Sequence, residues 1–181
     1  MGLDETLFPE VSDPVIAMRP APLALILVFL CVLAGCGGDT PKLEKGQPAP
    51  AFSLPDLTGN LLHYPQDLRG EVVVVRFWAD WCPFCGPEMR DIEPIYQQFR
   101  DQGLRILAVN VRQDQKTAAR FVESLGISYR TLLDEDGALA RRYGVSGLPT
   151  TYFLNRDGKI HARVLGEAAP GLFAKLVAEL L

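Results

Sequence analysis

The stretch that decides the fold is Phe77-Trp78-Ala79-Asp80-Trp81-Cys82-Pro83-Phe84-Cys85-Gly86-Pro87-Glu88. It follows four consecutive valines, Val72 to Val75, an apolar and β-branched run that is typical of a buried central strand. After Cys85 the apolar residues are spaced three or four apart, which predicts a helix. The sequence therefore places two cysteines, two residues apart, where a buried strand ends and a helix begins.

The start of a helix changes the chemistry of a cysteine. Its unpaired backbone N–H groups and partial positive charge favour an anion. Cys82 should therefore form a thiolate more readily than an ordinary cysteine, whereas Cys85, one turn into the helix, should be enclosed and less ionised. One attacking thiolate and one resolving thiol are what thiol–disulfide exchange requires, and this reaction needs no cofactor.

The Trp81 to Cys85 segment, together with Gly147-Leu148-Pro149-Thr150-Thr151 far downstream, resembles the thioredoxin superfamily. The nearer resemblance is to its TlpA/ResA-like branch of membrane-tethered, extracytoplasmic thiol–disulfide oxidoreductases. It covers about residues 48–181, where runs of predicted strands and helices favour one α/β domain. The fold implied is a thioredoxin-like sandwich, with a central mixed β-sheet flanked by helices and an N-terminal β-hairpin within residues 51–64.

The proline of the downstream motif directly precedes a predicted strand. In the superfamily the Leu148–Pro149 bond would be cis, which is accessible before proline, and the backbone of Leu148 would pair with the substrate chain. The alternative is an ordinary trans proline at a strand start. If the bond is cis, an apolar rim suited to a peptide is expected from four residues, namely Trp81, Pro83, Phe84 and Leu148.

Two charged residues stand close to the cysteines in sequence. Glu88 matches the acidic residue that TlpA/ResA-like proteins carry after the motif, where it is implied to assist proton movement; alternatively it is a first-turn carboxylate favoured by the helix dipole. Arg76 lies inside the buried strand, where an unpaired charge is very costly. We hypothesise an ion pair with Glu88, which would keep that carboxylate ionised and weaken it as a proton acceptor. The other possible partners are Glu71 and Asp80.

The first part of the chain reads as an export signal. Residues 1–17 are acidic and aperiodic, which suggests a gene-model extension or a disordered segment, with translation starting at Met18. Residues 18–35 combine an arginine with a short apolar run, as in a signal peptide. The run ends in Leu33-Ala34-Gly35-Cys36, which resembles the bacterial lipobox and implies lipidation of Cys36. The alternative is an uncleaved anchor helix with an incidental cysteine.

Export and lipidation would leave Cys82 and Cys85 as the only free cysteines, in a compartment where disulfides persist. Residues 36–50, rich in turn formers, are predicted to be a flexible tether between the lipidated cysteine and the domain of residues 51–181. The expected location is the bacterial cell envelope, on the periplasmic or extracytoplasmic face of a membrane. The formal net charge is −4 without a basic block, which argues against a nucleic-acid partner.

The leading function is therefore disulfide exchange with protein substrates, with electrons passed to or from a membrane partner by a monomer. The branch favours a reductase, and cytochrome c maturation is one pathway it implies, whereas the Pro83-Phe84 dipeptide resembles glutaredoxin- and DsbA-like centres. A thiol peroxidase of peroxiredoxin type is an alternative, although Ala79 replaces the Thr or Ser such enzymes use. A metal-binding module is another, but two cysteines fall short of a zinc site, and His63 and His161 lack ligand spacing.

Overall fold

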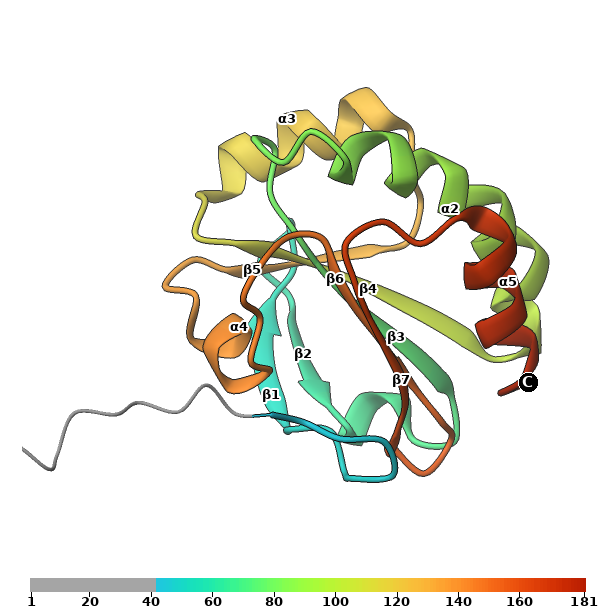
Figure 1. The fold of residues 1–181 in the computed structure, drawn as a ribbon. Coiled ribbons are helices and arrows are strands. Elements are labelled where there is room, and N and C mark those ends of the chain that lie inside the picture. Colours follow the sequence, from blue (N-terminus) through green and yellow to red (C-terminus); the bar gives the residue numbers. More distant parts are fainter. Residues whose placement is uncertain (1–41) are drawn as a thin grey trace, which may run out of the picture. The chain divides into compact units, whose positions relative to one another are not determined.

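The computed structural model describes residues 42–181, and a five-stranded mixed sheet lies at their centre (Figure 1). The sheet order is β5-β4-β3-β6-β7, in which β3, β4 and β5 are parallel and β6 and β7 are antiparallel to their neighbours. The sheet strands are β3 (Val72–Trp78), β4 (Leu104–Val111), β5 (Arg130–Asp134), β6 (Thr150–Leu154) and β7 (Ile160–Leu165). The predicted leader, the signal segment and Cys36 lie outside the described residues.

Helices and a hairpin cover the sheet. The hairpin pairs β1 (Phe52–Pro55) with β2 (Leu61–Tyr64) in a separate two-stranded sheet. The helices are α2 (Cys85–Phe99), α3 (Gln115–Leu125), α4 (Ala138–Arg142) and α5 (Pro170–Ala178), with short 3-10 turns at Gln66–Leu68 and Arg100–Gln102. The predicted sandwich of a mixed sheet, flanking helices and leading hairpin is confirmed.

Strand β3 is buried on both faces, as its run of valines predicts. Alternate side chains point to opposite faces of a strand. Val72, Val74 and Trp78 pack in one core with residues of α2 and α5, whereas Val73 and Val75 pack in a second core with the hairpin and α4. Figure 1 shows these two layers on opposite sides of the sheet. Strand β3, which leads into the cysteine motif, is therefore packed between two cores.

The helix boundaries follow capping chemistry. Helix α3 begins after Asp114, whose carboxylate accepts from the Thr117 N–H, and is capped by Gly126 in the left-handed conformation. The predicted helix after the strand begins at Cys85 itself, and a 3-10 turn follows its last residue, Phe99. The last helix begins with Pro170, whose fixed φ suits the first position of a helix, and ends at Ala178.

The last residues of the predicted tether are hydrogen-bonded to the domain. Gly46 N–H donates to the carbonyl of Ile160 at 2.7 Å, and Ile160 N–H donates to Gln47 at 2.9 Å. Ala49 N–H donates to Gly158 at 2.9 Å. The domain therefore includes residues 46–49, which were predicted to belong to the tether. That prediction was based on their content of turn-forming residues, and composition does not show where backbone hydrogen bonds go.

Within residues 42–181, no helix combines the length and the apolar character needed to cross a membrane.

Candidate active site

The two cysteines lie at the junction of β3 and α2. The chain leaves β3 at Trp78, and one turn closes when Cys82 N–H donates to the Ala79 carbonyl at 3.2 Å. Cys85 is the first residue of α2, and its sulfur forms a disulfide with that of Cys82. The Cα atoms are 5.4 Å apart, a separation usual for a disulfide. The predicted pair is thus brought together at the predicted junction.

Cys82 is the more accessible of the two cysteines, although both are buried in the oxidised form. Cys82 is 3% exposed and Cys85 is fully buried. Phe84, the residue before α2, gives this helix start no side-chain cap. Cys85 N–H donates to the Cys82 carbonyl at 3.1 Å, and Glu88 N–H donates to the Phe84 carbonyl at 3.4 Å. Because Pro87 has no N–H, the Gly86 N–H and the positive end of the helix dipole are what can stabilise an anion beside the motif. This arrangement suits Cys82 as the attacking sulfur.

Arg76 and Glu88 form a buried ion pair next to the cysteines. Arg76 Nη1 lies 2.6 Å from Glu88 Oε1, with side chains 0% and 3% exposed. Arg76 also donates to Thr151 Oγ1 at 3.1 Å, and Ala168 N–H donates to Glu88 Oε1 at 3.2 Å. Glu88 follows Cys85 by three residues, so both side chains share one side of α2. The hypothesised partner is therefore the one the structure shows.

The other possible partners of Arg76 are engaged elsewhere. Glu71 pairs with Arg105, whose Nη2 lies 3.0 Å away. Asp80 bonds to Gln113, which accepts from Asp80 N–H at 2.9 Å and donates back to its carboxylate. Asn110 at the end of β4 also donates to Gln113 Oε1, at 2.8 Å. These bonds fix the segment that leads into Cys82, and sequence reasoning missed Gln113 because its partner lies 33 residues away.

The downstream proline loop lies against this junction. The Leu148–Pro149 bond is cis, as predicted. Strand pairing begins at Thr150, so Leu148 lies outside the sheet ladder. Trp81 and Phe84 are 68% and 54% exposed, which is unusual for large apolar side chains beside a buried disulfide. The structure therefore provides an exposed apolar surface next to Cys82.

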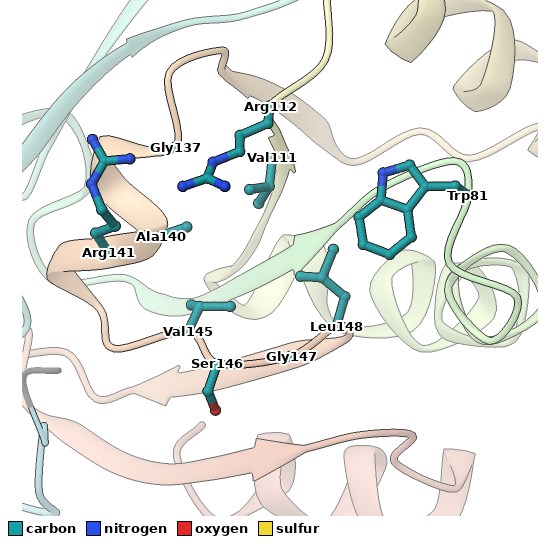
Figure 2. A pocket seen from close by; sticks show the side chains of 10 residues that line it. All are labelled: Trp81, Val111, Arg112, Gly137, Ala140, Arg141, Val145, Ser146, Gly147 and Leu148. Carbon is teal, nitrogen blue, oxygen red and sulfur yellow. The ribbon is translucent and has the colours of Figure 1, made fainter.

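A pocket of about 260 Å³ opens beside this surface (Figure 2). Trp81 and Leu148 line it on the side of the redox centre. Arg112, which follows β4, and Arg141 of α4 also line this pocket, and both side chains are exposed. Sequence reasoning missed both arginines, because nothing in the spacing of residues 112 and 141 brings them to the redox motif.

Comparison with known proteins identifies the family. The sequence matches the AhpC/TSA family over residues 45–163, most of the domain. The chain belongs to the AhpC/TSA family.

The relatives of this chain include thiol–disulfide oxidoreductases named ResA. It is 33% identical over 147 residues to ResA of Bacillus subtilis (strain 168), covering 78% of this chain and 82% of ResA. It is also 33% identical over 153 residues to ResA of Geobacillus thermodenitrificans (strain NG80-2), covering 83% and 87%. These relatives confirm the predicted TlpA/ResA-like resemblance and the enzyme class, thiol–disulfide oxidoreductase.

Similar solved structures confirm the thioredoxin-like fold. A protein from Chlorobium tepidum described as the thiol:disulfide interchange protein DsbE superposes with a TM-score of 0.72 at 28% identity, covering 77% of this chain and 99% of that one. The thioredoxin domain of a thiol-disulfide oxidoreductase from Bacteroides vulgatus gives 0.70 at 25% identity, covering 77% and 100%.

The two histidines stand apart from this AhpC/TSA-type site. His63 is exposed on the hairpin and bonds to Ser53 Oγ at 2.7 Å. His161 on β7 is 22% exposed, and its Nε2 lies 2.9 Å from Glu179 Oε2. Over residues 42–181, no three His, Cys, Asp or Glu side chains are grouped as metal ligands.

Proposed function

We propose that this protein reduces disulfides of extracytoplasmic protein substrates through Cys82 and Cys85. The observation that carries the proposal is the Cys82–Cys85 pair at the start of α2, beside the cis Leu148–Pro149 bond and the exposed ring of Trp81. An extended substrate chain would lie against Leu148, with its sulfur facing Cys82 and its apolar side chains on Trp81, Pro83 and Phe84.

The reaction needs only the two sulfurs. In the reduced protein the Cys82 thiolate attacks one sulfur of the substrate disulfide, and a mixed disulfide forms while the other substrate sulfur leaves as a thiolate and takes a proton. The Cys85 thiol then loses its proton and attacks the Cys82 sulfur, which releases the second substrate thiol. Two electrons have moved to the substrate, and the Cys82–Cys85 disulfide remains. A dithiol partner at the membrane would reduce it again.

The Arg76–Glu88 pair is proposed to tune the second step. Cys85 must lose a proton in a buried place, and Glu88 is the carboxylate on its side of α2. Arg76 Nη1 lies 2.6 Å from Glu88 Oε1 and holds this carboxylate in place. Arg76 therefore acts as a positioning residue for Glu88.

Attachment to the membrane is part of the same proposal. Lipidation of Cys36 would hold the domain near a membrane electron donor, with the segment before Gly46 as the link. A similar structure from Mycobacterium tuberculosis, a disulfide oxidoreductase homologous to DsbE, is described as secreted; it superposes with a TM-score of 0.65 at 25% identity, covering 71% of this chain and 96% of that one. Apocytochrome c is one substrate that a reductase in this location could act on.

A peroxidase is the second candidate because the AhpC/TSA family matches. The residue three before Cys82 is Ala79, which is fully buried and has no hydroxyl to donate to a peroxide. The relatives compared above are named oxidoreductases that exchange thiols and disulfides. Disulfide exchange is therefore the better supported activity.

The reduction potential of Cys82–Cys85 tests the proposal. Equilibration of the protein against thioredoxin or glutathione should give a reversible two-electron couple near that of thioredoxin, about −270 mV. A value near that of DsbA, about −120 mV, would mean an oxidase or isomerase instead. The absence of any reversible couple would reject disulfide exchange altogether.

A further inference from the structure

The pocket beside Trp81 and Leu148 is lined by positively charged side chains that have no role in the exchange reaction described above. The proposed rim is apolar, yet two arginines line this pocket and none of its lining residues is acidic. The whole chain carries a formal net charge of −4, so two guanidinium groups in one pocket run against the overall balance. Neither Arg112 nor Arg141 forms an ion pair with a carboxylate of residues 42–181.

Arg112 is held over the pocket by its backbone. It is the only non-glycine residue with a positive φ, 58°, in the part of the chain the structure describes. That conformation is costly for a side chain larger than glycine and persists where the surroundings impose it. Arg112 N–H donates to the Asp134 carbonyl at 3.0 Å, which fixes the turn after β4.

Gly137 provides the space for the Arg112 side chain. A Cβ atom at Gly137 would lie 2.6 Å from Arg112 Nε and 3.0 Å from its Cγ, so the stem of Arg112 lies directly over this glycine. Figure 2 shows Arg112 running back across the pocket toward Gly137 and Ala140, with Trp81 at the opposite edge. The stem of Arg112 thus lies over the pocket while its side chain stays exposed to solvent, and no carboxylate of residues 42–181 pairs with its charge.

Arg141 approaches from α4. Its Nη1 donates to the backbone carbonyl of Asp136 at 2.9 Å, which anchors the guanidinium and leaves its other N–H groups free to donate. The nearby carboxylate of Asp134 is already used, because it accepts from the N–H groups of Leu139 and Ala140 at 2.9 and 2.8 Å. The residues that line the pocket therefore present N–H donors and positive charge, and the neighbouring carboxylate of Asp136 accepts from the Ala138 N–H at 2.8 Å.

We propose that this pocket binds a carboxylate of the substrate polypeptide, a few residues from the disulfide to be exchanged. Guanidinium groups suit a carboxylate because their planar N–H donors match its two oxygens. The apolar part of the pocket accommodates the carbon chain of such a residue. The proposal rests on the proposed function, and it adds that the enzyme favours substrates with an acidic residue near the reactive cysteine.

The test uses reduced protein and two-cysteine peptides closed by an intramolecular disulfide. The peptides are acetylated and amidated and differ in one residue, Glu, Gln or Lys, placed in turn at each of three positions on either side of the disulfide. Single-turnover rates of peptide reduction are followed by acid quenching and chromatography. At one or more positions Glu should react about five- to tenfold faster than Gln, and Lys should react more slowly. The advantage should shrink as salt rises.

The double variant Arg112→Gln/Arg141→Gln should reduce the Glu advantage to less than about twofold. Arg69→Gln/Arg120→Gln is the matched control, since both arginines are exposed and lie outside the pocket and the change in net charge is the same; this variant should keep the preference. A Gln peptide with a free terminal carboxylate separates the two sources of the group, because a rate gain in this peptide shows that the chain end also binds.

Two results would overturn the proposal. One is equal rates for Glu and Gln peptides at every position in the unaltered protein. The other is a preference that survives in the Arg112/Arg141 double variant. If no peptide of the series is reduced, disulfide exchange itself fails, and that outcome differs from uniform reduction without a charge preference.

Discussion

At the scale of single residues, the buried Arg76–Glu88 ion pair is not explained by its contribution to protein stability. Both side chains are buried, and Arg76 Nε, Arg76 Nη2 and Glu88 Oε2 have no hydrogen-bond partner within the described residues. Moving two charges from water into a core costs several kcal/mol each, and one short contact compensates for this only in part. A pair of apolar residues of similar size would pack there at no greater cost, so a role in the chemistry of Cys85 is the better explanation.

Replacing one or both partners tests this account. Arg76→Met should destabilise the protein by about 3–5 kcal/mol because it leaves Glu88 buried without its counter-charge. The double variant Arg76→Met/Glu88→Leu should unfold within about 1 kcal/mol of the unaltered protein, or be more stable. Urea unfolding of the oxidised protein measures both values, and adding the single variant Glu88→Leu completes the double-mutant cycle, in which the coupling of the pair is the effect of the double variant minus the sum of the two single effects.

The pH dependence of exchange separates a chemical role from a structural one. Arg76→Met removes the positive charge that faces Glu88, so the pH profile of the exchange rate should differ from that of the unaltered protein, whereas the double variant, which removes both charges, should differ less. Identical pH profiles in all three proteins would limit the pair to structure. A double variant that unfolds as easily as the single one would contradict the account of its cost.

Residues whose chemistry is tied to a local pattern could be predicted from the sequence. Cys82, Cys85 and Pro149 belong to such patterns, and Arg76 could be paired with Glu88 because a buried charge must find an opposite one. Gln113 and Arg112 could not be predicted. Their positions depend on where β4 ends relative to β3 and on a turn with positive φ, and neither leaves a periodic signal in the chain.

At the scale of elements, the carboxylate of Asp56 connects the N-terminal hairpin to β5, beside a backbone bridge between Asp56 and Leu132. Asp56, at the end of β1, accepts from Thr58 N–H at 2.9 Å and from Asn60 N–H at 3.0 Å, which closes the hairpin turn. Its other oxygen lies 2.7 Å from Arg130 Nη2 on β5. Desolvation raises the pKa of Asp56, but the bonds from Thr58, Arg130 and Asn60 outweigh it and lower the pKa to about 2.

This carboxylate predicts a pH-dependent contribution to stability. The pKa of Asp56 is lower in the folded protein than its ordinary value of 3.8, so its contribution is complete above about pH 3.8 and is lost as pH falls toward about 2. Asp56→Asn should lower the free energy of unfolding at pH 7 by about 1–2 kcal/mol, and the difference should shrink between pH 4 and pH 2. Urea unfolding across this range measures it.

Asp157→Asn provides the matched control, because Asp157 is exposed in the turn between β6 and β7 and its carboxylate accepts no hydrogen bond within residues 42–181. This variant should match the unaltered protein at every pH. A constant difference for Asp56→Asn down to pH 2 would show that the lost bonds, and not the charge, carry the effect.

The elements themselves were largely predictable, and their ends were less so. The apolar run of β3 and the helical spacing of apolar residues in α2 and α3 reflect which residues face a core. These patterns can therefore be recognised in the sequence alone. The ends of the elements depend on local geometry and on single contacts. Helix α2 begins at Cys85 and leaves Pro83 outside. Residues 46–49 are held by backbone hydrogen bonds to residues more than 100 positions later in the chain. Local composition carries no information about such partners.

At the scale of the whole molecule, the proposed reaction requires the domain to meet a membrane electron donor. In the proposal above, this contact is made possible by a lipid attached before the described residues. A diacylated cysteine anchors a chain far more firmly than one acyl group, because each buried methylene adds about 0.8 kcal/mol. Cys36 is the residue proposed to carry these chains.

Cys36→Ser tests the attachment. In a bacterium that processes lipoproteins, the unaltered chain should sediment with the membrane and incorporate labelled palmitate, whereas the variant should lose the label and leave the membrane fraction almost completely. Its Cys82–Cys85 couple should keep the same reduction potential, because Cys36 precedes the domain that holds the disulfide. A variant that stays in the membrane without label would indicate an uncleaved anchor helix in residues 18–35. The lipid would then be dispensable, and the domain would reach its electron donor through a peptide anchor instead.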